Sequence, residues 1–164
     1  MKIFVSYRRQ DSARWSGRIV DALSSRYGPG QVFSDIANIS PGVDFRSHIE
    51  DAVSNADAVL AVIGPHWLDA TYRDEGRRRI DDAQDLVRGQ LWTAIRLQKV
   101  LVPVLVGGAV MPTADMLPGE IASLAERQYV SLDDVTWNQD ISRLTKLLDR
   151  TATSRWARLL RWKR

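Results

Sequence analysis

The sequence predicts an α/β protein of flavodoxin-like type, with a doubly wound sheet of five parallel strands. Short apolar stretches alternate along the chain with longer amphipathic ones. The clearest of the short stretches, residues 58–63, contains no polar residue, which is typical of a strand whose two faces are both covered. A chain of 164 residues without internal repeats or an interdomain linker suits one domain with one substantial core.

The first half of the chain contributes two predicted strands, at residues 2–7 and 32–34, each followed by a helix. Asp11 or Ser12 can cap a helix that runs to about residue 27. Gly28, Pro29 and Gly30 end it, and residues 35–42 form a loop before a second helix at about 44–54. The apolar face of the first helix is made by residues at helical spacing, namely Trp15, Ile19, Ala22, Leu23 and Tyr27.

The second half repeats this alternation. A charged stretch at 73–85 precedes a helix at 86–97, and a strand follows at 101–106. After a loop rich in glycine and proline at 107–119 we expect a short helix at 120–127, a brief strand at 128–130 and a last helix at 138–150. The helix at 86–97 has a buried stripe of apolar residues, namely Val87, Leu91, Ala94 and Ile95.

Composition excludes several classes of site. The chain has no cysteine and only two histidines without paired spacing, so no metal site is expected. No glycine-rich phosphate loop of either common pattern follows a strand. Residues 151–164 hold five basic side chains and no acidic one, so residues 1–150 hold 18 basic against 20 acidic residues. A slightly acidic body argues against a nucleic-acid partner.

Ligands of such sheets bind beyond the carboxyl ends of the strands, which here are residues 6–9, 34–35 with its loop, 64–67 and the loop after Val106. Arg8 and Arg9 could bind a pyrophosphate by charge-assisted hydrogen bonds, or could be a solvated surface pair. Trp67 could stack on an aromatic ligand ring, or could plug the end of the sheet. Gln90 lies at the edge of the apolar stripe on its helix, and spacing alone favours an exposed amide there.

Four segments in order resemble a bacterial TIR (Toll/interleukin-1 receptor) domain: Phe-Val-Ser-Tyr-Arg-Arg at 4–9, Val-Phe-Ser-Asp at 32–35, Ile-Ser-Pro-Gly at 39–42 and Ala-Val-Ile-Gly-Pro-His-Trp-Leu at 61–68. The resemblance covers about residues 2–148. It implies the TIR fold and two family functions, which are cleavage of NAD+ at the nicotinamide–ribose bond and association with other TIR domains. The implied NAD+ pocket is built from Ser6, Tyr7, Arg8, Arg9, Phe33, Asp35, Ile36 and Trp67.

The same resemblance places Gln90 where these domains carry a catalytic glutamate. A neutral amide has nearly the size of a carboxylate but neither its charge nor its basicity. We therefore expect a signalling domain that binds NAD+, as substrate or ligand, with weakened cleavage, unless Glu75 or Asp85 supplies the missing carboxylate. The alternative is a non-catalytic scaffold that self-associates through the loop at 36–43.

The last segment, 151–164, is predicted to be a basic amphipathic tail separate from a TIR domain at 1–150. Trp156, Leu159 and Leu160 share one helical face among arginines, which suits an anionic membrane surface or the flank of a membrane segment. The other interpretation of residues 155–164 is a frayed basic terminus. A strand pattern from residue 2 leaves no room for a signal peptide, so a cytoplasmic location is expected, with membrane association through the tail.

Overall fold

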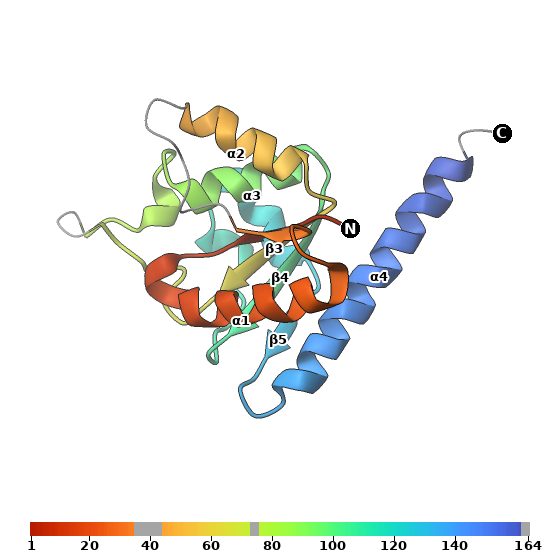
Figure 1. Ribbon diagram of the computed structural model, residues 1–164. Coiled ribbons are helices and arrows are strands. Elements are labelled where there is room, and N and C mark those ends of the chain that lie inside the picture. The colour runs from red at the N-terminus through yellow and green to blue at the C-terminus, as the bar shows by residue number, and fades with distance from the viewer. Residues whose placement is uncertain (35–43, 73–75, 162–164) are drawn as a thin grey trace.

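The computed structural model describes residues 1–34, 44–72 and 76–161, with the backbone only at 45, 46 and 153–161. In these residues five strands form one parallel sheet, as the sequence predicts, and their order is β2-β1-β3-β4-β5 (Figure 1). Their bounds are β1 Ile3–Ser6, β2 Val32–Phe33, β3 Ala58–Ile63, β4 Val100–Val106 and β5 Val130–Leu132. The last strand begins two residues later than expected.

Helices cover both faces of the sheet, α2 and α3 on one side and α1 and α4 on the other (Figure 1). The α-helices of the described residues are α1 Arg9–Tyr27, α2 Phe45–Ser54, α3 Leu86–Arg96 and α4 Trp137–Arg161. The same part of the chain also forms the short 3-10 helices η1 Arg79–Asp81, η2 Ala114–Met116 and η3 Gly119–Glu126.

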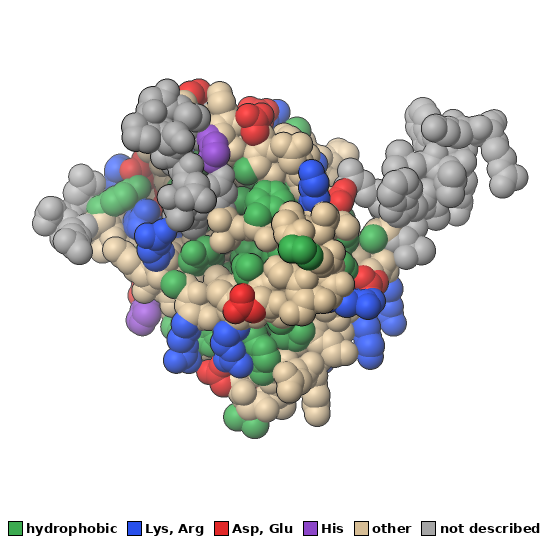
Figure 2. Space-filling model, in the orientation of Figure 1, with side chains coloured by type: hydrophobic (Ala, Val, Ile, Leu, Met, Phe, Trp, Pro, Cys, Tyr) green, Lys and Arg blue, Asp and Glu red, His purple; other side chains and the backbone are tan. Residues whose placement is uncertain are grey.

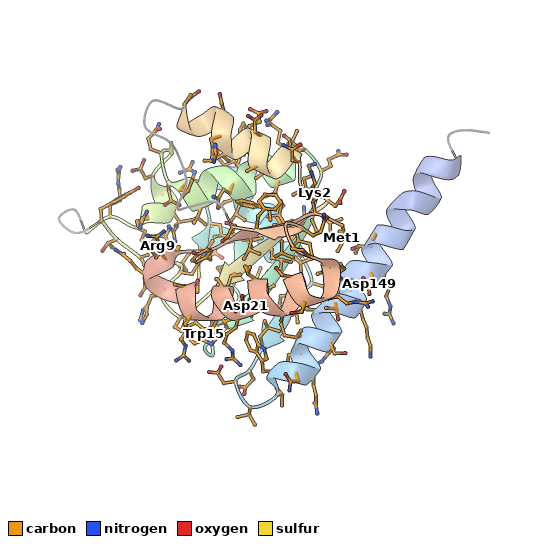
Figure 3. All side chains as sticks on the ribbon, viewed as in Figure 1. Met1, Lys2, Arg9, Trp15, Asp21 and Asp149 are labelled. Atoms are coloured by element: carbon orange, nitrogen blue, oxygen red, sulfur yellow. The ribbon has the colours of Figure 1, made fainter. Side chains whose placement is uncertain are left out.

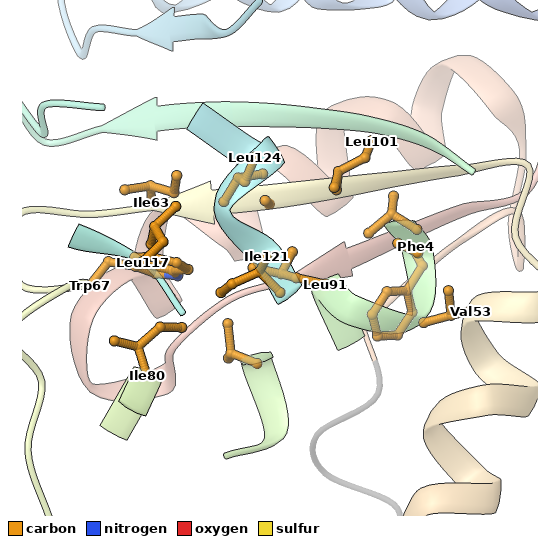
Figure 4. Close-up of a cluster of buried hydrophobic side chains, with 14 of the residues drawn as sticks. Phe4, Val53, Ile63, Trp67, Ile80, Leu91, Leu101, Leu117, Ile121 and Leu124 are labelled. Carbon is orange, nitrogen blue, oxygen red and sulfur yellow. The ribbon is translucent and has the colours of Figure 1, made fainter. Parts of the chain in front are cut away.

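The two faces of β3 supply two separate cores, because successive side chains of a strand point to opposite sides. Val59, Ala61 and Ile63 pack toward α2, α3 and η3. Figure 4 shows this cluster, in which Leu91 of α3 and Ile121 of η3 lie close together. The other core, against α1 and α4, contains Ala58, Leu60, Val62, Ile19, Leu23, Leu144 and Leu148.

The start of α1 differs from the sequence prediction. The helix begins at Arg9, its N-cap Arg8 makes no side-chain cap, and Ser12 has non-helical backbone angles that kink the first turn. Asp11 does not cap the helix, because its carboxylate accepts hydrogen bonds from the backbone N–H of Gly64 (3.0 Å) and of His66 (2.8 Å). Asp11 thus fixes the loop after β3, and a Cβ on Gly64 would lie 2.4 Å from this carboxylate.

The last helix is longer than predicted. We expected it to end near residue 150, but α4 continues unbroken through 151–154 to Arg161. Its first half is held to the body by buried Leu144 and Leu148, and by Asp149, which accepts a hydrogen bond from the Tyr27 hydroxyl at 2.9 Å (Figure 3). Burial and this bond raise the pKa of Tyr27 above its ordinary value. The far end of α4 extends beyond the sheet (Figure 1).

Candidate functional site

The predicted site residues fall into three groups in the structure. Four of them, Ser6, Arg8, Trp67 and Gln90, are buried where β1 ends, and hydrogen bonds link Ser6 to Gln90 and Arg8 to Trp67. Tyr7 and Arg9 line a shallow hollow of about 290 Å³ beside this cluster. The last of the described site residues, Phe33, packs edge-on against Phe4, whereas Asp35 and Ile36 fall outside the described residues.

Gln90 is buried, with 1% of its surface exposed, so the exposed amide favoured by spacing is wrong. Its Oε1 accepts a hydrogen bond from the Ser6 hydroxyl at 2.7 Å. Gln90 is buried because α3 packs close to the end of β1. At that contact Gln90, at the edge of the apolar stripe of its helix, meets Ser6. The centre of the candidate site is therefore a neutral amide bonded to a neutral hydroxyl.

Arg8 is neither a solvated arginine nor a free ligand for phosphate. Its two terminal nitrogens donate to the two carboxylate oxygens of Asp85, each at 2.9 Å, and its Nε donates to the backbone carbonyl of Trp67 at 2.9 Å. The two side chains are 2% and 0% exposed. A bidentate pair of this kind has a fixed geometry, and it ties the end of β1 to the loop after β3 and to the start of α3.

Asp85 also caps α3. Its carboxylate accepts the backbone N–H of Arg88 at 3.0 Å, as an N-cap residue does, and Arg79 Nε lies 3.6 Å away. Of the two acidic residues considered as replacements for the missing carboxylate, Asp85 is thus occupied by three partners. The other, Glu75, lies outside the described residues.

Trp67 plugs the end of the sheet. Its side chain is 1% exposed and packs in the core on the α3 side, where Figure 4 labels it near Ile80 and Leu117. The indole Nε1 is buried and finds no hydrogen-bond acceptor within the part of the chain that the structure describes. The neighbouring His66 is exposed and lies 3.7 Å from Asp69. No set of three metal-binding side chains occurs among the described residues.

A larger hollow, of about 540 Å³, lies on another side of α3 and does not reach Gln90. Trp92, 41% exposed, forms part of its wall beside Arg96, which pairs with Glu50 of α2 at 2.5 Å. Sequence reasoning did not identify this groove. The signal that could have found it is Gly89, because glycine is unfavourable inside a helix. Packing does not require a glycine there, since an added Cβ would lie at an ordinary distance of 3.6 Å from Ile49.

Comparison with known proteins agrees with this architecture. The TIR domain family model matches residues 3–148. The TIR domains of the activated Roq1 resistosome, which directly recognises the pathogen effector XopQ, superpose with a TM-score of 0.61 at 14% identity, covering 90% of this chain and 98% of that one.

The TIR domain of the Toll-related receptor TRR-2 from Hydra magnipapillata superposes with a TM-score of 0.57 at 17% identity, covering 92% of this chain and 97% of that one. At these identities the two structures show a shared fold. The comparison with curated proteins gave no significant match. The family match extends over most of the sequence, from β1 into α4, and the chain belongs to the TIR family of signalling domains.

Proposed function

We propose that this TIR domain binds NAD+ at the carboxyl edge of its sheet and cleaves it weakly, because an amide occupies the catalytic position. The observation that carries the proposal is Gln90, buried at the end of β1 with its Oε1 bonded to Ser6. The hydrogen-bonding reach of a catalytic glutamate is kept there, and its negative charge is lost.

The charge matters because breaking the bond between nicotinamide and ribose develops oxocarbenium character on the sugar. A nearby carboxylate stabilises that positive charge, whereas an amide offers only a dipole. Asp85 does not substitute for it, because its carboxylate already binds Arg8 and the start of α3. Loss of one electrostatic contributor of this kind costs on the order of 10²–10³ in rate.

For binding, the proposal assigns the NAD+ pyrophosphate to Arg9. Arg9 is exposed beside Tyr7 in the shallow hollow, while Arg8 is held in its ion pair. An exposed guanidinium can turn two N–H groups toward a phosphate and form charge-assisted hydrogen bonds.

The test is NAD+ turnover by the purified domain, followed by mass spectrometry of nicotinamide and ADP-ribose. We expect little or no cleavage by the natural sequence and a gain on the order of 10²–10³ in Gln90→Glu. Gln139→Glu makes the same charge change at an exposed position at the start of α4 and should stay at the natural level. Turnover by the natural sequence equal to that of Gln90→Glu would refute the proposal.

A second candidate function is a scaffold that works by association with other TIR domains without using NAD+. The observation that favours it is the closure of the site: Ser6, Arg8, Trp67 and Gln90 are each at most 3% exposed. Thermal unfolding with and without NAD+ separates the candidates. A ligand at about 100 times its Kd stabilises a protein by about 2.7 kcal/mol, and the absence of any shift supports the scaffold.

A further inference from the structure

We propose that Arg79 is a second arginine for the pyrophosphate of NAD+ and that it makes the domain select dinucleotides over mononucleotides. The proposal rests on the proposed function, in which Arg9 binds that pyrophosphate. Arg79 begins η1 and Arg9 begins α1, so the two residues are far apart in sequence. Both nevertheless line the shallow hollow of about 290 Å³ beside the buried cluster. Among the described residues its lining includes three arginines, the third being Arg8, and no acidic side chain.

The charges around this hollow do not cancel. Arg8 is bonded at both terminal nitrogens to Asp85. Arg79 Nε lies 3.6 Å from the same carboxylate, too far for a hydrogen bond, and this buried Nε has no hydrogen-bond partner in the described part of the chain. Arg9 is exposed, and no described residue forms an ion pair or a side-chain hydrogen bond with it. Three arginines against one aspartate leave a charge of +2.

Several arginines elsewhere on the domain are paired with acids. Arg14 and Arg18 both pair with Asp134, and Arg88 pairs with Glu120 at 2.7 Å. Figure 2 shows the same pattern over one face, where Lys and Arg side chains are interspersed with Asp and Glu. Guanidinium groups that keep unused N–H donors while they line one hollow therefore indicate a site for an anion.

The position of Arg79 is fixed by its neighbours. Its backbone N–H donates to the carbonyl of Ala70 at 2.7 Å, and its guanidinium lies over the Tyr72 ring, 4.9 Å from the centroid. An arginine stacked on an aromatic ring loses less freedom when it binds a ligand, because its side chain is already ordered. Gln10 lines the hollow as well, and Leu86 adds apolar surface that a ribose or a base can cover.

Charge and geometry together select a pyrophosphate that joins two nucleosides. Each of its phosphates carries one negative charge and two free oxygens, which match the fork of one guanidinium. The two phosphates of NAD+ can thus bind Arg9 and Arg79 at the same time and balance their charge. Nicotinamide mononucleotide has the same nicotinamide–ribose bond but only one phosphate, whose three free oxygens cannot fill both forks. The contact with Arg79 is therefore the difference between the two ligands, and such a difference sets the specificity.

The test is isothermal titration calorimetry of the full chain with NAD+ and with nicotinamide mononucleotide. We expect the natural chain to bind NAD+ roughly 10–100-fold more tightly, which is the contribution of one charge-assisted hydrogen-bonded pair. Arg79→Gln should lose that factor for NAD+ and leave the affinity for the mononucleotide unchanged. Arg79→Lys keeps the charge without the fork and should recover only part of the loss.

The matched control is Arg150→Gln, which removes one exposed arginine from α4. Its neighbour Asp149 lies across the domain from Arg9 (Figure 3), so both affinities should stay at the natural level. Circular dichroism and the thermal midpoint establish that the variants are folded.

Three results overturn the assignment of Arg79 alone. These are equal affinity of the natural chain for the two ligands, unchanged NAD+ affinity in Arg79→Gln, and an equal loss of both affinities in that variant. In each of them measurable NAD+ binding leaves the proposed function standing. A natural chain that binds no NAD+ overturns the assignment and the proposed function together.

Discussion

Replacing Gln90 with glutamate should make the stability of this domain depend on pH in a new way. The substitution replaces the Gln90 amide with a carboxyl group of nearly the same size. Gln90 is only 1% exposed, and its side chain accepts a hydrogen bond from the Ser6 hydroxyl. Burial disfavours the charged form, so the pKa of the new carboxyl rises above that of glutamate in an unfolded chain, which is about 4.3.

The magnitude follows from the size of that rise. Buried glutamates in enzymes reach pKa values of about 6–7, and each unit of difference is about 1.36 kcal/mol. The folded state then holds its proton more tightly than the unfolded state. Stability is close to that of the natural protein below about pH 4, and it falls between about pH 4.3 and the raised pKa. The full loss above that range is about 2–4 kcal/mol.

Thermal unfolding of Gln90→Glu and of the natural protein, side by side at acidic and at mildly alkaline pH, measures this loss. For a domain of this size 1 kcal/mol shifts the midpoint by about 2–4 °C, so the deficit at high pH should be about 4–16 °C. At low pH the two midpoints should nearly coincide. The same deficit at both pH values would refute the reasoning, because it would arise from packing and not from charge.

Two further predictions concern the supports of the site, and a third concerns Asp140 near the start of α4. Asp85→Asn leaves the Arg8 guanidinium buried without its carboxylate and should cost about 3–5 kcal/mol in urea unfolding, whereas an unchanged midpoint would mean that the pair is solvated. Gly64→Ala drives a methyl group against the Asp11 carboxylate at 2.4 Å and should cost about 1–3 kcal/mol, while Gly119→Ala, with open space around it, should cost little. Hydrogen bonds, the strongest from the Thr136 hydroxyl, hold the pKa of Asp140 below its ordinary 3.8. The stabilisation by this carboxylate is therefore present at neutral pH and is lost as the group is protonated. The difference in unfolding free energy between the unsubstituted protein and Asp140→Asn should narrow below about pH 4.

The fold could be predicted from the sequence because its signals are local. The run of apolar residues in β3 and the helical spacing of Ile19 and Leu23 are visible within a few residues, and both lie in the core as expected. The five parallel strands of the observed sheet agree with the predicted fold class. The ends of the elements are harder to predict. Threonine and serine at 151–154 suggest that the last helix ends there, but α4 continues because no glycine or proline interrupts it.

The contacts of the site could not be predicted, because they join residues far apart in sequence. Ser6 and Gln90 are 84 positions apart, and Arg8 and Asp85 are 77 apart. Periodicity places a residue on a helix face but does not say which distant strand end that face will meet. For that reason spacing favours an exposed amide at Gln90. It also cannot decide whether Arg8 binds a ligand phosphate or is a solvated surface residue.

The ion pair between Arg8 and Asp85 has a consequence for how this domain can change over evolutionary time. It anchors the start of α3 five residues before Gln90, so the position of that helix does not rest on the side chain at 90 alone. An exchange of glutamine and glutamate at position 90, in either direction, is therefore expected to leave the frame of β1, the loop after β3 and α3 in place.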